Sequence, residues 1–79
     1  MRRIPVHSTS IASIGYLPAS RELEVEFRES GDVYRYFDVP GEEYEAFMAS
    51  ESKGTYLNQV FKPREYRYFV VLEGKKQRF

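Results

Sequence analysis

The residue types best suited to hold an anion lie between Ser52 and Thr55. If a helix starts here, its exposed backbone N–H groups, the small Gly54 and the cation of Lys53 suit a phosphate group. The stretch lacks the Gly-Lys spacing of a P-loop, and the alternative interpretation is that Ser52 only caps the helix. Asn58 would add an amide one or two turns later, and basic residues follow it. The predicted nucleic-acid or phosphate-binding residues are Ser52, Lys53, Gly54, Asn58, Lys62, Arg64 and Arg67.

Catalytic chemistry is not favoured by the residues present. The only histidine is His7, there is no cysteine, and His7 beside Ser8 and Ser10 reads as a solvent-facing polar run rather than part of a triad. The carboxylates are scattered and lack the clustered spacing of metal ligands. We therefore expect a protein that is not an enzyme, with no catalytic residue, no metal and no cofactor.

Tyr34-Arg35-Tyr36 has two interpretations. On an open sheet face the two rings could stack on unpaired bases while Arg35 contacts phosphate. If the rings face the helices, they belong to the core and cannot stack on a base. The strand register predicted below favours the core.

The elements that would position these residues begin with a strand over Glu22–Arg28, where Leu23, Val25 and Phe27 alternate with three glutamates. One face should be apolar, and the glutamates should point to water as independent charges. Pro18–Arg21 has hairpin length and pairs this strand with the preceding one. The predicted partners are Leu17 with Glu22, Tyr16 with Leu23, Ile14 with Val25, and Ala12 with Phe27.

A second turn over Glu29–Asp32 offers Gly31 where a tight hairpin needs a positive φ. This turn predicts that Phe27 faces Tyr34, Glu26 faces Arg35 and Val25 faces Tyr36. Both tyrosines then join the apolar face. A register change of one residue would reverse that placement.

Two helices should follow. Asp38–Glu43 has a helix-start pattern, and Tyr44, Phe47 and Met48 then form one buried stripe. The second helix should begin near Ser52 and stop before Pro63, with its core residues being Tyr56, Leu57, Val60 and Phe61. Residues 66–72 read as a strand that is apolar on both faces, so we expect it to be covered on both sides and to pair with another strand or a partner subunit.

Length and composition set the limits of the fold. The 79 residues suffice for one domain over residues 1–79, and a hydrophobic fraction of 42% predicts a folded core rather than a disordered chain. No apolar run approaches a membrane span and no leader is evident, so we expect no membrane partner and a cytoplasmic protein. The net charge of zero conceals blocks of +3 over residues 1–21, −8 over 22–51 and +5 over 52–79, which predict a bipolar surface unless they are solvated faces.

The order of short motifs resembles a known family, the KTSC domain. It consists of Val6–Ile11, Ile14-Gly15-Tyr16, Leu23–Phe27, Val33–Tyr36, Val39-Pro40, and Ser52, Gly54, Tyr56 and Asn58 within residues 49–58. The resemblance covers about residues 5–68 and leaves 69–79 as a C-terminal extension. Leu17 and Phe61 depart from the family's tendency to place an acid and an aliphatic residue there.

That domain occurs alone in small bacterial and phage proteins and at the C-terminus of some lysyl-tRNA synthetases, so the resemblance implies an RNA partner. We predict an α+β fold: an antiparallel three-stranded meander, two short helices on its apolar face and a C-terminal strand. The leading functional hypothesis is a non-enzymatic RNA- or nucleic-acid-binding accessory module. The alternative is a protein-interaction or oligomerisation domain, with a protein partner or homodimer held through the C-terminal strand.

Overall fold

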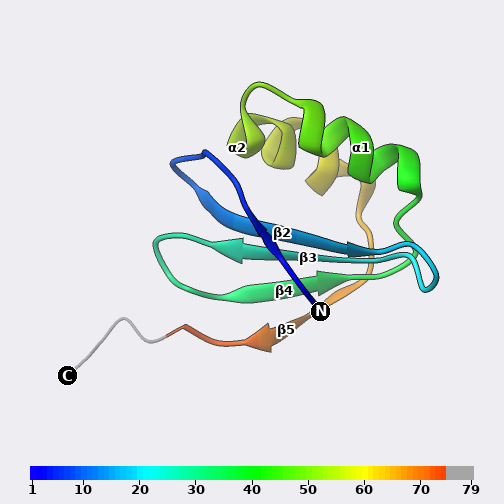
Figure 1. Cartoon of the computed structure of the whole chain (residues 1–79), viewed down its shortest axis with the longest axis horizontal. Helices are drawn as coiled ribbons and strands as arrows, with labels where there is room; N and C mark the ends of the chain where they lie inside the picture. The colour runs from blue at the N-terminus through cyan, green and yellow to red at the C-terminus, as the bar shows by residue number, and fades with distance from the viewer. Residues whose placement is uncertain (75–79) are drawn as a thin grey trace.

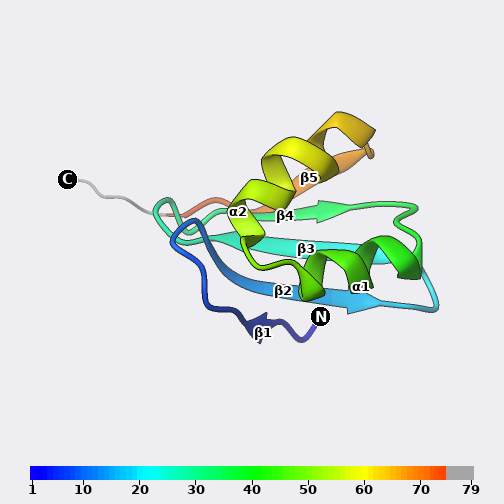
Figure 2. The same ribbon diagram turned by 90° about the horizontal axis from the view of Figure 1, so that it is seen from above.

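The computed structural model describes residues 1–74 and shows an antiparallel sheet with helices over one face (Figures 1 and 2). The strands lie across the sheet in chain order, which confirms the predicted α+β class and adds one short strand at the N-terminal end. The strands are β1 (Ile4–Pro5), β2 (Ile11–Leu17), β3 (Glu22–Phe27), β4 (Val33–Tyr36) and β5 (Tyr68–Leu72). No helix within residues 1–74 is long and apolar enough to cross a bilayer.

The hairpin between β2 and β3 has the predicted loop, and its register is as expected for most of its length. Tyr16 pairs with Leu23 and Ile14 with Val25, but Phe27 lies opposite Ile11 rather than Ala12. The reason is an irregularity between Ile11 and Ser13, which inserts an extra residue into β2. Ile11 and Ile14 can therefore both join the core, where each is fully buried.

The pairing of β3 with β4 differs from the prediction by two residues. Val25 faces Tyr34 and Leu23 faces Tyr36, because the turn begins one residue earlier than predicted: the Phe27 N–H donates to the Asp32 carbonyl at 2.8 Å, so the loop consists of residues 28–31. Gly31 does adopt a positive φ, of 77°. A shift of two preserves the alternation of the pleat, so both tyrosines still lie on the helix-covered face. The predicted sheet face of Tyr34 and Tyr36 was therefore right, and their predicted partners on β3 were wrong.

The helical layer contains α1 (Gly41–Ala49) and a second helical segment over residues 53–64. That segment is continuous but irregular: α2 (Lys53–Tyr56) leads into a π turn, η1 (Leu57–Phe61), and then into a 3₁₀ turn, η2 (Lys62–Arg64). Pro63 was expected to end the helix before it. Instead it fits the first turn of η2, where a missing N–H is tolerated, and the segment ends at Glu65 in the left-handed conformation.

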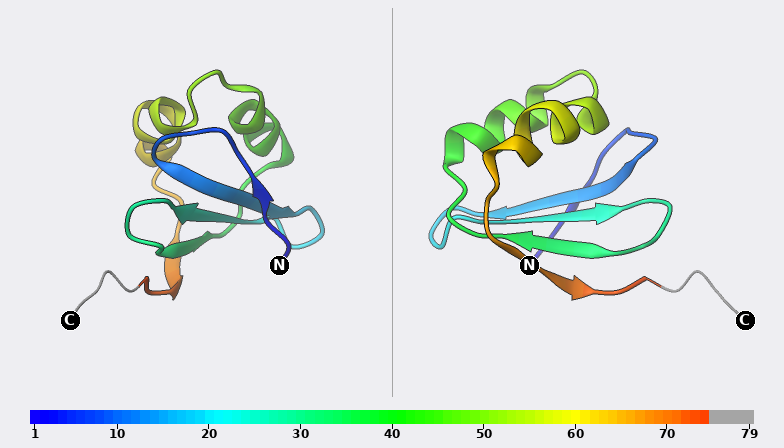
Figure 3. Two further views of the ribbon diagram at one scale, coloured as in Figure 1. Left: turned by 60° about the vertical axis from the view of Figure 1, so that its left-hand side comes forward. Right: turned by 180° about the vertical axis from the view of Figure 1, so that it is seen from behind.

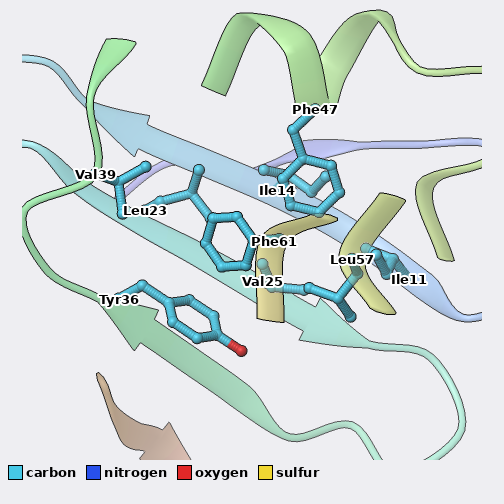
Figure 4. Packing of buried hydrophobic residues seen from close by; sticks show 9 residues of the cluster. All are labelled: Ile11, Ile14, Leu23, Val25, Tyr36, Val39, Phe47, Leu57 and Phe61. Atoms are coloured by element: carbon cyan, nitrogen blue, oxygen red, sulfur yellow. The ribbon is translucent and has the colours of Figure 1, made fainter. Parts of the chain in front are cut away.

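The core lies between the sheet and the helices, as Figure 4 shows. Phe47 from α1 and Phe61 from η1 meet Tyr36 from β4, and the Tyr36 and Phe61 rings are 4.8 Å apart in an edge-to-face arrangement. Burial, together with the neighbouring Tyr34 and Tyr68, raises the pKa of Tyr36 to about 12. Tyr34 is half-buried at the edge of this cluster.

The opposite face of the sheet is not the uniformly wet surface that the alternation predicted. Glu24 is buried with a side-chain exposure of 2% and accepts hydrogen bonds from Arg3 at 2.9 Å and from Arg35 at 2.6 Å. Arg3 directly precedes β1 and also donates to Ser13 at 3.1 Å. The alternation in the sequence placed Glu24 on the correct face of the sheet, but it could not show that the guanidinium groups of Arg3 and Arg35 cover this carboxylate.

Three of the ion pairs join different charge blocks of the sequence. Arg3 reaches Glu24, Arg64 reaches Glu43, and Arg67 lies 3.3 Å from Asp38. Each pair connects a basic block with the acidic middle block. At these positions basic and acidic side chains lie side by side, so their charges do not form the bipolar surface that the sequence predicted.

The C-terminal strand departs most from expectation. It begins at Tyr68 rather than Tyr66, and it pairs with β4 on one side (Figure 3). All five of its side chains are exposed, so the expected coverage on both sides is wrong. Phe37 donates its N–H to the Arg67 carbonyl at 2.8 Å and so begins the β4–β5 ladder.

Candidate nucleic-acid interface

A polar cavity of about 700 Å³ opens between the loop before β2 and the start of the second helical segment. One wall consists of residues 7–10 with Arg28 from the end of β3. The other wall consists of residues 51–55 with Asn58 and Gln59. The lining therefore contains two cations, one carboxylate, an imidazole and several hydroxyl and amide groups, a set suited to binding a polar anionic ligand.

The first wall is held in place by Arg28. Its Nε donates to the Ser8 carbonyl at 3.0 Å, and its Nη2 donates to the carbonyls of Val6 and Ile11 at 3.3 and 3.2 Å. The Ser8 hydroxyl in turn accepts the N–H groups of Ser10 and Ile11, both at 3.2 Å. Backbone groups of this loop are thus bonded within the wall, and the cation of Arg28 is fixed beside the cavity.

The second wall combines a helix cap with a cation. Ser52 accepts the N–H of Thr55 at 3.2 Å, so it is the cap that the alternative interpretation required. Lys53 donates to the Ser50 carbonyl at 2.6 Å, and an ammonium group keeps two further N–H donors. Both roles coexist in the structure, because the capping serine lines the same cavity as the lysine.

Gly54 brings the two walls together. A Cβ at this position would lie 2.9 Å from the Ser10 Oγ and 3.3 Å from the Ser10 Cβ. A side chain at this position would therefore require the Ser10 hydroxyl to turn away and the two walls to separate slightly. The sequence predicted that this small residue would allow a phosphate to approach closely. In the structure it allows the close approach of Ser10, on the other wall of the cavity.

The structure brings together four of the seven predicted site residues, namely Ser52, Lys53, Gly54 and Asn58. Lys62 lies beyond them, on the rim of two neighbouring hollows. Arg64 and Arg67 are not part of this cavity. Arg64 is paired with Glu43, and Arg67 lies near Asp38 with its guanidinium 5.1 Å from the Phe37 ring centroid.

The neighbouring hollows extend the cavity toward the aromatic residues of β4 and β5. Thr9 and Ser10 line both the cavity and the second hollow, and Lys62, Tyr34 and Tyr36 line both the second hollow and the third. Tyr34 stacks on Tyr68, with ring centroids 5.1 Å apart and planes at 15°. We call these three adjoining hollows the binding groove. It carries Arg28 and Lys53 at one end, Lys62 beside the carboxylates of Glu29 and Asp32 in the middle, and aromatic side chains at the other end, where Tyr68 is exposed.

Arg64 serves a different purpose, because it holds a buried carboxylate. Glu43 of α1 accepts hydrogen bonds from Arg64 at 2.6 Å, from the Tyr66 hydroxyl at 2.7 Å and from the Tyr56 hydroxyl. Burial by itself raises the pKa of Glu43, but the three donors outweigh it and hold the pKa below its ordinary value of 4.5. Burial and the carboxylate together raise the pKa of Tyr66 to about 12.

Sequence reasoning missed the first wall of the groove. His7 to Ser10 were interpreted as a solvent-facing run and Arg28 only as part of the acidic block, yet they line the cavity opposite Lys53. A signal was present: the polar run ends at Ile11, and Arg28 ends the strand that pairs with it. Residues at the adjoining ends of two paired antiparallel strands lie together, so Arg28 could have been placed beside this run.

Comparison with known proteins places these residues in a family context. The family model described as the KTSC domain matches residues 7–66. An uncharacterised protein of Stutzerimonas stutzeri (strain A1501) is 48% identical over 71 residues, which cover 90% of this chain and 99% of that protein. A protein of Tsukamurella paurometabola is 40% identical over 60 residues, which cover 76% of this chain and 88% of that protein.

A solved structure shares the fold. The crystal structure of a KTSC domain protein from Yersinia pestis matches with a TM-score of 0.83 and 39% sequence identity, covering 90% of this chain and 97% of that one. The match of residues 7–66 includes most of the groove-lining residues, whereas β1 and β5 lie outside it.

Proposed function

This chain belongs to the KTSC domain family, and we propose that it is a non-enzymatic accessory module that binds single-stranded RNA along the binding groove. The observation that carries this proposal is the continuity of the groove. Shared lining residues join a cavity bearing Lys53 and Arg28 to a hollow bearing Lys62 and then to stacked tyrosines. Cations followed by exposed rings suit a chain of phosphates and unpaired bases.

The individual groups supply the expected contacts. The ammonium groups of Lys53 and Lys62 would face phosphates, with the fixed charge of Arg28 adding to the field. The exposed Tyr68 ring offers a stacking surface, whereas Tyr36 is only 6% exposed and serves the core. The serine and threonine hydroxyls of the first wall are donors and acceptors for a ribose 2′-hydroxyl or a base edge.

The test compares two charge reversals of equal size. Lys53→Glu with Lys62→Glu changes the groove, and Arg2→Glu with Arg21→Glu makes the same change in net charge outside the residues that line the groove. Arg64 is left intact, since it holds Glu43. Binding of a fluorescent single-stranded RNA oligonucleotide is followed by anisotropy over a series of salt concentrations.

We expect the groove variant to lose about tenfold or more in affinity at low salt. The slope of log affinity against log salt should fall by roughly 1.4, since each phosphate contact on a single strand contributes about 0.7. The control variant should keep most of the affinity. Equal losses in both variants, or no binding by the parent protein, would contradict the proposal.

A further inference from the structure

We propose that the cavity at one end of the binding groove holds a terminal phosphate of the RNA strand, so that the protein recognises the end of a chain rather than its interior. We call this cavity, of about 700 Å³ between the loop before β2 and the start of α2, the basic cavity. Its ligand is a phosphate monoester, which has about two negative charges at neutral pH and three acceptor oxygens. The inference rests on the proposed function, because it specifies which part of a single-stranded RNA occupies the cavity.

The first observation is the uneven distribution of charge along the groove. The basic cavity is lined by two cations, Arg28 and Lys53, and by one carboxylate, Glu51. The middle hollow has the single cation of Lys62 beside two carboxylates, and the third hollow has Lys62 and Glu65. Cations therefore outnumber carboxylates only in the basic cavity among these three hollows. The most highly charged group of a strand is its terminal phosphate, which this part of the groove attracts most.

The second observation is a set of hydrogen-bond donors that the fold leaves available on both walls of the cavity. Arg28 donates through Nε and Nη2, whereas its Nη1 has no acceptor within residues 1–74. Lys53 gives one hydrogen to a backbone carbonyl and keeps two. The Ser8 hydroxyl accepts two N–H groups and the Thr55 hydroxyl accepts a neighbouring hydroxyl, so each still has its own hydrogen to donate.

These donors match a phosphate monoester better than an internal phosphodiester. A monoester accepts hydrogen bonds on three oxygens at once, whereas a phosphodiester has a single charge and fewer free oxygens. Arg28 is already held by three carbonyls, so binding costs its side chain little further freedom. The volume of the cavity lies in the range of small-molecule sites, so it admits the terminal nucleotide together with its phosphate.

The third observation is the position of the basic cavity along the groove. It shares Thr9 and Ser10 with the middle hollow and shares no lining residue with the third, so it is the end member of the three. A strand whose terminal phosphate lies in this cavity can pass Lys62 and bring its following bases to the stacked rings of Tyr34 and Tyr68. The order of the hollows thus matches the order of groups from the end of a strand inward.

The first experiment uses the parent protein and varies only the end of the RNA. Fluorescence anisotropy compares one short, unstructured oligonucleotide with a phosphate or a hydroxyl at its 5′ end, and a second pair with the same difference at the 3′ end, each labelled at the opposite end. We expect the phosphate to tighten binding about tenfold at one of the two ends, which is the effect of one hydrogen bond to a charged group. A hydroxyl-ended oligonucleotide that is two nucleotides longer is the control, because it adds charge without a monoester and should show no such gain.

A second experiment locates the phosphate within the groove by two matched substitutions. Lys53→Gln should remove most of the preference for the phosphorylated end, because Lys53 lines the basic cavity. Lys62→Gln makes the same change of charge in the middle of the groove, so it should weaken binding of both oligonucleotides by a similar factor and keep the preference. Thermal melting of each variant confirms that the fold is retained.

Competition separates the end of a strand from a free phosphate compound. Inorganic phosphate and uridine 5′-monophosphate should displace the phosphorylated oligonucleotide only at far higher concentrations, since they make none of the contacts along the groove. Displacement by the mononucleotide at the same concentration as by unlabelled oligonucleotide would overturn the inference and assign the cavity to a free nucleotide. Equal binding of phosphate-ended and hydroxyl-ended RNA would overturn it while leaving the proposed function intact, whereas no binding of any RNA would overturn both.

Discussion

Glu43 and Glu24 are both buried carboxylates, but the groups that hold them differ. Glu43 is 6% exposed and is bound by two phenol hydroxyls and one arginine, contributed by residues between Tyr56 and Tyr66. Glu24 is 2% exposed and is bound by Arg3 and Arg35, whose side chains keep 27% exposure. The two phenols that bind Glu43 lie between packed elements, although Arg64 is 53% exposed, whereas both partners of Glu24 are arginines whose side chains touch water.

This difference teaches what each carboxylate does for the fold. The Glu43 cluster ties α1 to the second helical segment and to the chain that leads into β5, and its two tyrosines pack against the core, so they cannot leave without disturbing the packing. The Glu24 cluster covers one face of the sheet, and its guanidinium groups can turn outward if the carboxylate is lost. We therefore expect unequal costs when the two are removed.

The largest effect should follow from Glu43→Ala. Removal leaves the Tyr56 and Tyr66 hydroxyls without their shared acceptor in a half-buried position and opens a gap beside α1. Breaking a buried charged network of this kind costs about 3–5 kcal/mol of unfolding free energy. Urea denaturation measures it, with Glu42→Ala as the control, because Glu42 is exposed in the same helical turn.

Glu24→Ala should cost less, about 1–3 kcal/mol, because the two arginines can regain hydration. The same denaturation experiment tests it. Glu22→Ala is the matched control, since Glu22 lies 3.6 Å from Arg35 and is itself partly exposed. A loss for Glu24→Ala equal to or above that of Glu43→Ala would contradict the distinction between packed tyrosine partners and arginine partners that can turn outward.

Tyr66→Phe sharpens the comparison by removing a single donor from Glu43. The ring stays in place and one hydrogen bond to a charged acceptor is lost, so we expect about 1–2 kcal/mol. Tyr44→Phe provides the reference, because the Tyr44 ring stacks on Tyr16 at 4.7 Å and would be retained. Losses that do not differ between the two variants would count against the hydroxyl as a structural donor.

The smallest effect is a dependence on acid pH. Because folding lowers the pKa of Glu43, its contribution to stability is present above pH 4.5, the ordinary value, and is lost as the pH falls through the lower pKa of the folded state. Thermal melting from neutral to acid pH should show a steeper loss in the parent protein than in Glu43→Gln. Parallel curves would mean that other carboxylates account for the acid sensitivity.

The sequence predicted the face of the sheet on which a side chain lies better than it predicted the residue opposite that side chain. Alternation placed Leu23, Val25, Tyr34 and Tyr36 on one side correctly, because side-chain direction in a strand depends only on parity. The partner of Tyr34 was wrong by two residues, since the turn before β4 begins one residue earlier than predicted, and residue types alone do not specify where it begins. The same limit applies to the bulge near Ile11.

The candidate site was predictable only in part, for a related reason. Ser52, Lys53, Gly54 and Asn58 are close in sequence on one helical segment, so local reasoning could group them. Arg64 is close in sequence as well, yet it points to Glu43, because a helical segment presents different residues on different sides. Neither buried glutamate could be identified, since burial there comes from side chains distant in the chain.

The three carbonyl contacts of Arg28 have a consequence for how the protein moves. These contacts fix the middle of the segment between β1 and β2, whose two ends are held by backbone hydrogen bonds from the Val6 N–H to the Ala12 carbonyl and from the Arg28 N–H to the Ser10 carbonyl. Amide protons of residues 7–10 can then exchange with solvent through a local opening that leaves the sheet intact. A change at the Arg28 side chain should therefore alter the shape of the groove more than it alters the free energy of unfolding of the whole domain.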